Sequence, residues 1–297
     1  MRDARRAVVW LVTLAAIVIA GDHLLSLAFR RLLLRSQFRF SRLYRGGNDA
    51  AVLVLGDSRG VHSFYAPAIE ELTGLRAMNL SYNSMTPRIA EAVLTDYLER
   101  NAKPRLVIID VTSLTVTSDL ATELRTYSGL SPRLAALYAE EHPVAARAGR
   151  LFWLYPFNSE LFLQALHYMR RSDQDWIFRN TVSQSLRNGP EAHWRLEPVP
   201  AQLAALSRIA ALLRQRGIEA CFVITPYFPS RTPLNAEEVA AAIERSTGVR
   251  ARSYVSAISD PDLFADTVHL NERGSRALLA IMARDGAFGM ARPAARF

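Results

Sequence analysis

The sequence has one cysteine, Cys221, among 297 residues. A single thiol excludes a disulfide framework and any zinc or iron–sulfur site that needs several cysteines. Four of the six histidines have no carboxylate or cysteine at metal-ligand spacing, and we therefore predict no metal: His23, His142, His167 and His193. Internal repeats and low-complexity linkers are absent as well. Hydrophobic residues make up 50% of the chain, which predicts a folded protein with a sizeable core.

Acidic residues are scarce only at the start of the chain. Residues 1–45 hold nine arginines against Asp3 and Asp22, a balance of +7, whereas the other 252 residues hold 27 basic and 26 acidic side chains. The net charge of +8 therefore belongs mostly to the amino-terminal segment. The rest of the chain has no basic stripe of the kind that nucleic-acid binding needs, and we predict no nucleic-acid partner.

One long hydrophobic run is present, at residues 7–29, between two pairs of arginines. At about 1.5 Å per residue, a helix of this length crosses a hydrocarbon core of roughly 30 Å. Asp22 and His23 interrupt the run, so either the span ends near Gly21 and residues 24–34 lie along the interface, or the polar pair lies at the headgroups. We predict an uncleaved signal anchor. A cleaved signal peptide is the alternative, although no small-x-small cleavage site follows the run.

Flanking charge leaves the orientation of this anchor open. More arginines follow the span than precede it, and the positive-inside rule would then leave the body of the protein in the cytoplasm. The same arginines could instead bind anionic headgroups as a juxtamembrane segment.

From Gly46 onward, short apolar runs alternate with longer helical patterns. Strands are predicted at Ala51–Leu55, Arg76–Leu80, Leu106–Asp110 and Ala220–Thr225, and helices at Pro87–Asn101, Pro200–Arg216, Ala236–Thr247 and Asn271–Asp285. Apolar strands separated by helices indicate a parallel sheet covered on both faces. The predicted fold class is α/β, a three-layer flavodoxin-like parallel sheet with an N-terminal transmembrane helix. We divide the chain into an anchor with a basic juxtamembrane segment (1–45) and one domain (46–297).

Two short motifs carry the chemistry. Gly56-Asp57-Ser58-Arg59-Gly60 directly follows the first strand, and ligands in open α/β sheets bind beyond the carboxyl ends of strands. Asp266 and His269 lie three residues apart, just before the last predicted helix. A serine hydroxyl is a weak nucleophile unless an imidazole removes its proton and a carboxylate orients that imidazole. We therefore predict a triad of Ser58, His269 and Asp266.

The residues around Ser58 also match G-x-S-x-G, the nucleophile elbow of α/β-hydrolases. Against that fold, Ser58 follows the first strand, no H-G-G-G loop precedes it, and Asp266 and His269 share one short loop. G-D-S after the first strand and D-x-x-H before the last helix instead resemble the SGNH, or GDSL-type, hydrolase superfamily over residues 48–285. The resemblance implies a nucleophile (Ser58), a general base (His269), an orienting carboxylate (Asp266) and no cofactor.

The resemblance also implies an oxyanion hole made by the backbone N–H of Ser58, a glycine N–H in a second block and an asparagine side chain in a third. Residues 79–86 resemble the second block, with Ser84 or Asn83 where glycine is usual, and a backbone N–H survives that change. The third block should follow Leu106–Asp110, where the chain reads Val111-Thr112-Ser113 and lacks G-x-N-D. An alternative donor such as Asn83 is then needed, and without one the enzyme would be slow or inactive.

Two neighbours of Ser58 and a long insertion have alternative interpretations. His62, one turn later, is more simply a partly exposed helix residue than a residue of the site, and Arg59 could contact an anionic substrate or form a salt bridge. Asp57 is expected to brace the turn. Residues 115–199 depart from the strand–helix alternation. They form either an extra helical layer with its own core or a cap over the site that holds a polymer or lipid.

The anchor narrows the resemblance to membrane-anchored SGNH proteins that acetylate polysaccharides or transfer D-alanine to teichoic acids. This implies a single-pass protein of the bacterial inner membrane with its body in the periplasm or outside the cell. The implied function is a serine esterase or acyltransferase acting on O-acyl, chiefly O-acetyl, groups of envelope polysaccharide. Implied partners are acylated polysaccharide or lipid-linked glycan, and a membrane acyltransferase. The alternatives are a weakly active or inactive scaffold and a lipid-ester hydrolase.

Overall fold

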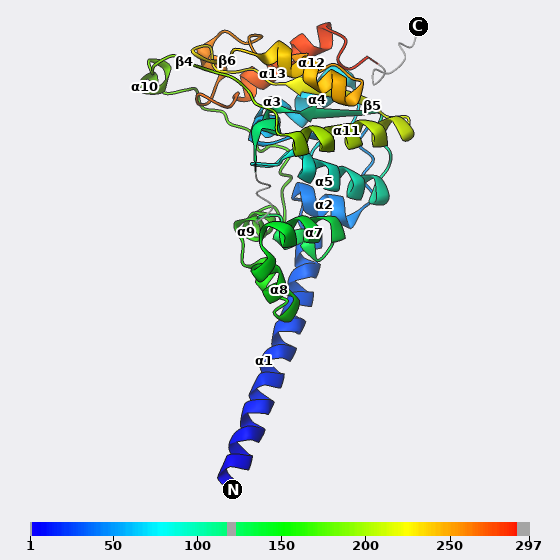
Figure 1. The fold of residues 1–297 in the computed structure, drawn as a ribbon, viewed down its shortest axis with the longest axis vertical. Helices are drawn as coiled ribbons and strands as arrows, with labels where there is room; N and C mark the ends of the chain where they lie inside the picture. Colours follow the sequence, from blue (N-terminus) through cyan, green and yellow to red (C-terminus); the bar gives the residue numbers. More distant parts are fainter. Residues whose placement is uncertain (1, 118–122, 290–297) are drawn as a thin grey trace. The chain divides into compact units, whose positions relative to one another are not determined.

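The computed structural model describes residues 2–117 and 123–289, which form two compact units (Figure 1). The helical unit comprises the described residues of 1–45 and 121–171, and the sheet unit comprises those of 46–120 and 172–297. The division into an anchor (1–45) and one domain (46–297) stays a prediction. The predicted insertion, 115–199, includes residues 118–122, which lie outside the described residues, and its other residues belong partly to each unit.

The sheet unit is built on five parallel strands in the order β2-β1-β3-β5-β7. Their bounds are Val52–Leu55 (β1), Ala77–Asn79 (β2), Leu106–Asp110 (β3), Glu219–Ile224 (β5) and Arg252–Ser253 (β7). This is the flavodoxin-like order, and it confirms the predicted fold class. A separate parallel pair, β4 (Ala192–Trp194) and β6 (Arg231–Pro233), was not predicted, because both strands are short and lack an apolar pattern.

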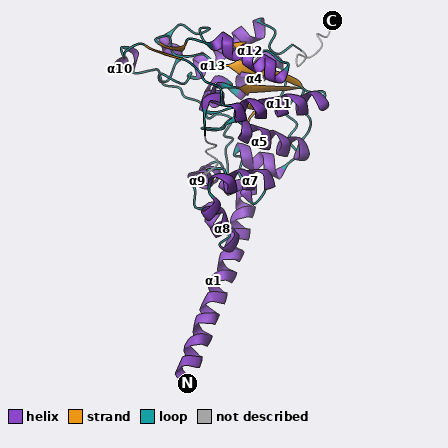
Figure 2. Cartoon of the chain, in the orientation of Figure 1, coloured by secondary structure: helices purple, strands orange, loops and turns teal. Residues whose placement is uncertain are grey.

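Helices cover the sheet, whose strands are orange in Figure 2. Their bounds are Ser58–Ser63 (α3), Ala66–Thr73 (α4), Pro87–Arg100 (α5), Gln184–Arg187 (α10), Pro200–Gln215 (α11), Ala236–Thr247 (α12) and Glu272–Arg284 (α13), with 3₁₀ turns at Thr112–Thr115 (η1) and Pro261–Leu263 (η3). Helix α13 packs on α3 and α4, whereas α11 packs on α5 and α12. Alternate strand residues such as Val52 and Val54 join the buried cluster that includes Leu278 of α13. Side chains alternate between the two faces of a strand, so each layer of helices receives its own apolar surface.

The helical unit is formed by α1 and a group of shorter helices. Their bounds are Arg2–Arg35 (α1), Arg39–Arg45 (α2), Arg125–Ser128 (α6), Pro132–Glu141 (α7), Pro143–Leu151 (α8) and Glu160–His167 (α9), with a 3₁₀ turn at Tyr155–Phe157 (η2). Among the described residues, α1 is the one helix long and apolar enough to cross a membrane. It continues without a break through Gly21, so the helix itself does not end at the polar pair.

Asp22 marks the point where α1 meets the rest of the helical unit. Its carboxylate accepts hydrogen bonds from the backbone N–H of Trp153 at 2.6 Å and of Leu154 at 3.2 Å. One turn later, the Ser26 hydroxyl donates to the Trp153 carbonyl at 3.0 Å. These polar groups in the predicted span therefore have protein partners, which removes much of the cost of placing them near lipid.

A steric prediction concerns Gly274 in the first turn of α13. A Cβ at this position would lie 2.0 Å from the Leu263 carbonyl oxygen, which is backbone and cannot move aside cheaply. We expect Gly274→Ala to destabilise the protein by about 1–3 kcal/mol, the usual cost of overpacking. Gly129→Ala is the control, because a Cβ there meets nothing within 4 Å. Thermal unfolding of the full chain in detergent measures the effect, and equal midpoints for the two variants would contradict it.

Candidate functional site

The predicted site residues gather at the carboxyl edge of the sheet. Ser58 directly follows β1 and opens α3, while Ser84 lies in the loop after β2. Thr112 follows β3. Asp266 and His269 lie on the loop between η3 and α13. In a parallel sheet all strands end at the same edge, so residues far apart in the sequence meet there.

Ser58, His269 and Asp266 form one hydrogen-bonded row. The Ser58 hydroxyl lies 2.9 Å from Nε2 of His269, and Nδ1 of the same ring lies 2.9 Å from Oδ2 of Asp266. The structure thus brings together the three residues predicted as a triad, across a separation of 211 residues. The distances are those of ordinary hydrogen bonds.

Asp266 is held in its ionised form. Burial acts to raise its pKa, but hydrogen bonds from the His269 ring and from the backbone N–H groups of Val268 and His269 outweigh this effect and lower the pKa to about 2. An ionised carboxylate can only accept, so Nδ1 of His269 carries the proton. Nε2 is then free to accept the Ser58 proton, which is the tautomer that a general base needs.

The turn that presents Ser58 lies directly on Asp110, the last residue of β3. A Cβ on Gly56 would lie 2.6 Å from the Asp110 Cβ. A Cβ on Gly60 would lie 2.7 Å from the Ser81 hydroxyl and 3.3 Å from the same Asp110 atom. Both glycines of the motif are therefore required for close packing. Asp57 caps α3 through a 2.8 Å hydrogen bond from the Arg59 N–H, as expected for a residue that braces the turn.

Asp110 is a second acidic group of the site, and it lies outside the motifs from which the site was predicted. Its carboxyl group is buried and hydrogen-bonds to the Asp57 carboxyl. Burial first, and the neighbouring Asp57 charge second, raise the pKa of Asp110 well above the ordinary value. A carboxyl–carboxyl hydrogen bond needs a proton, so Asp110 donates to Asp57 while accepting from the Thr112 N–H and hydroxyl. The sequence signal for a role in the site was the position of Asp110 at the end of β3, the strand that pairs with β1.

Arg59 is buried, and within the described part of the chain it has no salt bridge to a carboxylate, which corrects the salt-bridge alternative. Its guanidinium is buried and donates to the carbonyls of Pro226 at 2.7 Å and Val268 at 2.9 Å, with a longer bond to the Thr225 hydroxyl. The same group lies 3.8 Å from the Tyr227 ring centroid. Arg59 therefore ties the motif helix to the end of β5 and to the loop that carries His269.

His62 is buried, so the expectation of a partly exposed helix residue is wrong. Its ring stacks on Phe178 with centroids 4.0 Å apart and lies 5.2 Å from the His269 ring. Trp176 contacts His62 edge-on and also approaches Tyr82 of the second block. Phe178 is 36% exposed. We call Tyr82, Trp176 and Phe178 the aromatic wall. Two of its members come from the predicted insertion, where a surplus of aromatic residues was the only signal.

The second block has the backbone conformation that glycine normally supplies. Ser84 has a φ of +58°, the one positive φ among the non-glycine residues that the structure describes. Asn79, at the end of β2, is buried and donates to the carbonyls of Gly60 and Phe64, which ties this block to α3. Asn83 is exposed and Ser84 is partly exposed.

The third block provides no obvious replacement for the missing asparagine. The Thr112 hydroxyl donates to the Asp110 carboxyl group, and the Ser113 hydroxyl donates to the Met85 carbonyl at 2.9 Å. Both hydroxyl protons are used inside the protein. No group of three or more metal-ligating side chains occurs in the described part of the chain.

A neutral isostere tests the protonated state of Asp110. Because its pKa is raised in the folded protein, the folded state holds a proton that the unfolded chain releases above about pH 4. The wild type therefore loses stability as the pH rises, by at most about 1.4 kcal/mol per pH unit. In Asp110→Asn, the side-chain amide donates to Asp57 and accepts from Thr112 without having to bind a proton. This variant should therefore not lose stability as the pH rises.

Chemical unfolding at pH 4 to 8 measures the difference. Asp110→Ala is the control, because it removes both hydrogen bonds and should be destabilised throughout the range. Identical pH slopes for the wild type and Asp110→Asn would show that Asp110 is not protonated.

Comparisons with known proteins add a fold-level likeness. No family model and no curated protein matches the sequence. Among solved structures, a candidate platelet activating factor from Streptococcus pneumonia is 12% identical, with 93% of this chain and 98% of that chain covered and a TM-score of 0.41. A candidate lipolytic protein of the G-D-S-L family from Desulfitobacterium hafniense is also 12% identical, with coverages of 80% and 99% and a TM-score of 0.33. Likenesses of this size assign no activity. The sheet order by itself is that of a flavodoxin-like parallel α/β fold.

Proposed function

We propose that the protein is a membrane-anchored serine esterase or O-acyltransferase of the SGNH type. The observation that carries the proposal is the hydrogen-bonded row from Ser58 through His269 to Asp266, with both distances at 2.9 Å. The proposed nucleophile, base and orienting carboxylate are hydrogen-bonded to one another before any substrate binds. Preorganisation of this kind is what makes a serine hydroxyl reactive.

The proposed reaction proceeds in two halves. Ser58 Oγ forms a bond to the carbonyl carbon of an ester while its proton passes to Nε2 of His269. The ester C–O bond then breaks, the departing alcohol takes that proton, and the acyl group stays on Ser58. Water or a sugar hydroxyl next attacks the acyl carbon and gives its proton to His269. The bond between the acyl carbon and Ser58 Oγ then breaks, and His269 returns the proton to Ser58. Asp266 stays ionised and stabilises the imidazolium in both halves.

The proposed oxyanion hole consists of the backbone N–H groups of Ser58 and Ser84 and the side chain of Asn83. Its support is the left-handed backbone at Ser84, which stands where the family has glycine. Asn83 is exposed and could turn its amide toward the developing oxyanion. The aromatic wall beside His269 offers an apolar contact for the acyl or leaving group.

The proposed substrates are O-acyl, chiefly O-acetyl, groups of cell-envelope polysaccharide or lipid-linked glycan. The support is the combination of a hydrolase motif with α1, which would hold the site close to a membrane. We propose a location in the bacterial inner membrane with the sheet unit in the periplasm or outside the cell, and a membrane acyltransferase as a partner. A lipid-ester hydrolase would use the same chemistry, and it would prefer long acyl chains to acetyl.

The second candidate function is a non-catalytic, or weakly catalytic, SGNH-fold scaffold that binds envelope polysaccharide. One observation favours it: the hydroxyl protons of Thr112 and Ser113 are directed to Asp110 and Met85. The third block then supplies no side-chain donor, and losing one oxyanion donor can cost on the order of 10²–10³ in turnover.

Fluorophosphonate labelling of the full chain in detergent separates the two functions. We expect the wild type to label, Ser58→Ala not to label at all, and His269→Ala and Asp266→Asn to label at least about 10³-fold more slowly. Ser207→Ala is the matched control, because this α11 serine bonds only to the Ser246 carbonyl. A folded wild type that does not label would reject the enzyme and favour the scaffold. Labelling that survives Ser58→Ala would assign the reactive serine elsewhere.

The proposed oxyanion donor can be tested separately. Asn83→Ala should lower turnover of an acetyl ester by about 10²–10³-fold, while Asn83, being exposed, contributes little to stability. Ser84→Gly should keep full turnover, because glycine adopts a positive φ without strain and retains the N–H. Steady-state kinetics with p-nitrophenyl acetate measures both. Unchanged turnover in Asn83→Ala would remove its side chain from the hole.

A further inference from the structure

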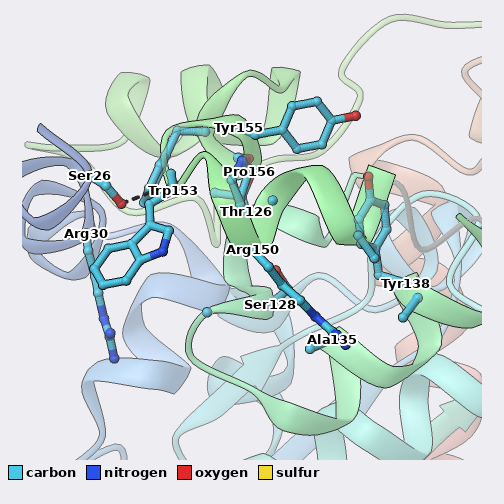
Figure 3. Close-up of a pocket in the computed structure, with 15 residues that line it drawn as sticks. Ser26, Arg30, Thr126, Ser128, Ala135, Tyr138, Arg150, Trp153, Tyr155 and Pro156 are labelled. Atoms are coloured by element: carbon cyan, nitrogen blue, oxygen red, sulfur yellow. Dashed lines mark hydrogen bonds between the residues drawn. The ribbon is translucent and has the colours of Figure 1, made fainter. Parts of the chain in front are cut away.

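The helical unit contains a cavity of about 340 Å³ between α1 and the segment that carries α6 to η2 (Figure 3). One side is formed by Ser26 and Arg30 of α1, one turn apart, with Trp153 beside them. Arg150 lies between this side and Tyr138 on the other. Its remaining lining is mainly small or aromatic, with Gly149, Tyr155, Pro156 and Phe157 among it. This cavity belongs to a different unit from Ser58.

The charged side chains that line this cavity are positive. Among the described residues they are Arg30 and Arg150. Within the described residues, neither guanidinium has a hydrogen-bond or ion-pair partner. Several other arginines bond to carboxylates, as Arg208 does to Glu91. Figure 3 shows the two guanidinium groups pointing away from one another, but both side chains are exposed and can turn toward a shared anion. Two such arginines beside a partly apolar cavity fit a ligand with a phosphate at one end and hydrocarbon at the other.

One wall of the cavity is fixed to α1 by hydrogen bonds. Asp22 accepts from the N–H groups of Trp153 and Leu154, and Ser26 donates to the Trp153 carbonyl. On the opposite side, the Thr126 hydroxyl donates to the Pro156 carbonyl at 3.0 Å. The walls of the cavity are therefore preformed, and a ligand would have to order chiefly the two arginine side chains.

Exposed apolar side chains indicate how far the acyl chains of the membrane reach along α1. On α1 they extend beyond the polar pair, where Leu24 is 68% exposed. Beside the cavity, Leu151 is 69% and Phe152 52% exposed, and both lie next to Trp153. An interfacial tryptophan with exposed leucine and phenylalanine is typical of a segment at the boundary of headgroups and acyl chains.

The length of α1 places the arginines at the same boundary. From Arg6 to Arg30 the helix rises about 36 Å, at about 1.5 Å per residue, which matches the hydrocarbon core plus part of the headgroup region. Arg30 would then lie at the height of the lipid phosphates. The exposed residues 151–153 would lie slightly deeper, among the first carbons of the chains.

We propose that this cavity binds the headgroup of an anionic phospholipid from the membrane that α1 spans. Arg30 and Arg150 hold the phosphate, and Trp153 and Phe157 contact the start of an acyl chain. The bound lipid stabilises the packing of α8 on α1. It thereby fixes the position of the helical unit relative to the membrane surface. The proposal is independent of the activity at Ser58.

Native mass spectrometry of the full chain in detergent tests it, with phosphatidylglycerol and phosphatidylcholine of the same acyl chains as probes. We expect the wild type to retain phosphatidylglycerol, and Arg30→Gln or Arg150→Gln to weaken this binding by about tenfold or more, as for a lost charged hydrogen bond. The matched controls are Arg31→Gln and Arg147→Gln, which remove the same charge from the same helices but lie outside the cavity lining. Fluorophosphonate labelling should be unchanged in all four variants.

Each other result would overturn the proposal. Equal loss in cavity and control variants would indicate general surface attraction. Equal retention of phosphatidylcholine would mean that the negative charge is not recognised. Displacement of the lipid by millimolar inorganic phosphate would indicate a site for free anions rather than for lipid. Circular dichroism checks that every variant is folded.

Discussion

The close contact between the β1–α3 turn and the buried carboxyl of Asp110 is the constraint on which the candidate site depends. Gly56 and Gly60 allow the turn to approach, since a Cβ at either position would overlap atoms of Asp110 or Ser81. The hydrogen bond from Asp110 to Asp57 then fixes the residue that caps α3. Ser58 is thereby presented at the first turn of a short helix, with its hydroxyl toward His269.

Arg59 extends this constraint across the sheet. Its buried guanidinium binds carbonyl groups from the end of β5 and from the loop before α13, so three separate segments share one cation. A guanidinium suits this role because it offers several donors in a fixed plane and remains charged when buried. The loop that carries Asp266 and His269 is therefore held from both sides, by Arg59 and by the packing of α13 on Leu263.

The two units differ in where their apolar side chains lie. In the sheet unit, apolar side chains are buried between layers and polar groups gather at one edge. In the helical unit, α1 leaves its apolar residues exposed from Val8 to Ile19, and Asp22 satisfies backbone N–H groups where the chain first gains protein cover. A bilayer around α1, as proposed above, would replace the core that a soluble helix needs.

The sequence by itself determined the parallel α/β fold, the long apolar helix near the start of the chain and the three residues of the candidate triad. The evidence for them was local: apolar strands, a mostly apolar run over residues 7–29 and two motifs at fixed places along the chain. Local patterns of this kind can be read directly from the order of the residues. The strand Leu106–Asp110 and the helix Ala236–Thr247 have the predicted bounds. The short strands β4, β6 and β7 carry no pattern and were not found.

Only the tertiary structure decided which residues surround that triad. Asp110, the buried Arg59 and the stack of His62 on Phe178 depend on contacts between segments that lie up to 209 residues apart. Contacts between distant segments also divide the insertion. Its residues up to 171 belong to the unit that contains α1, whereas Trp176 packs against His62. The protonation state and the burial of a side chain depend on which other groups lie near it in space. The order of the residues does not give these spatial distances.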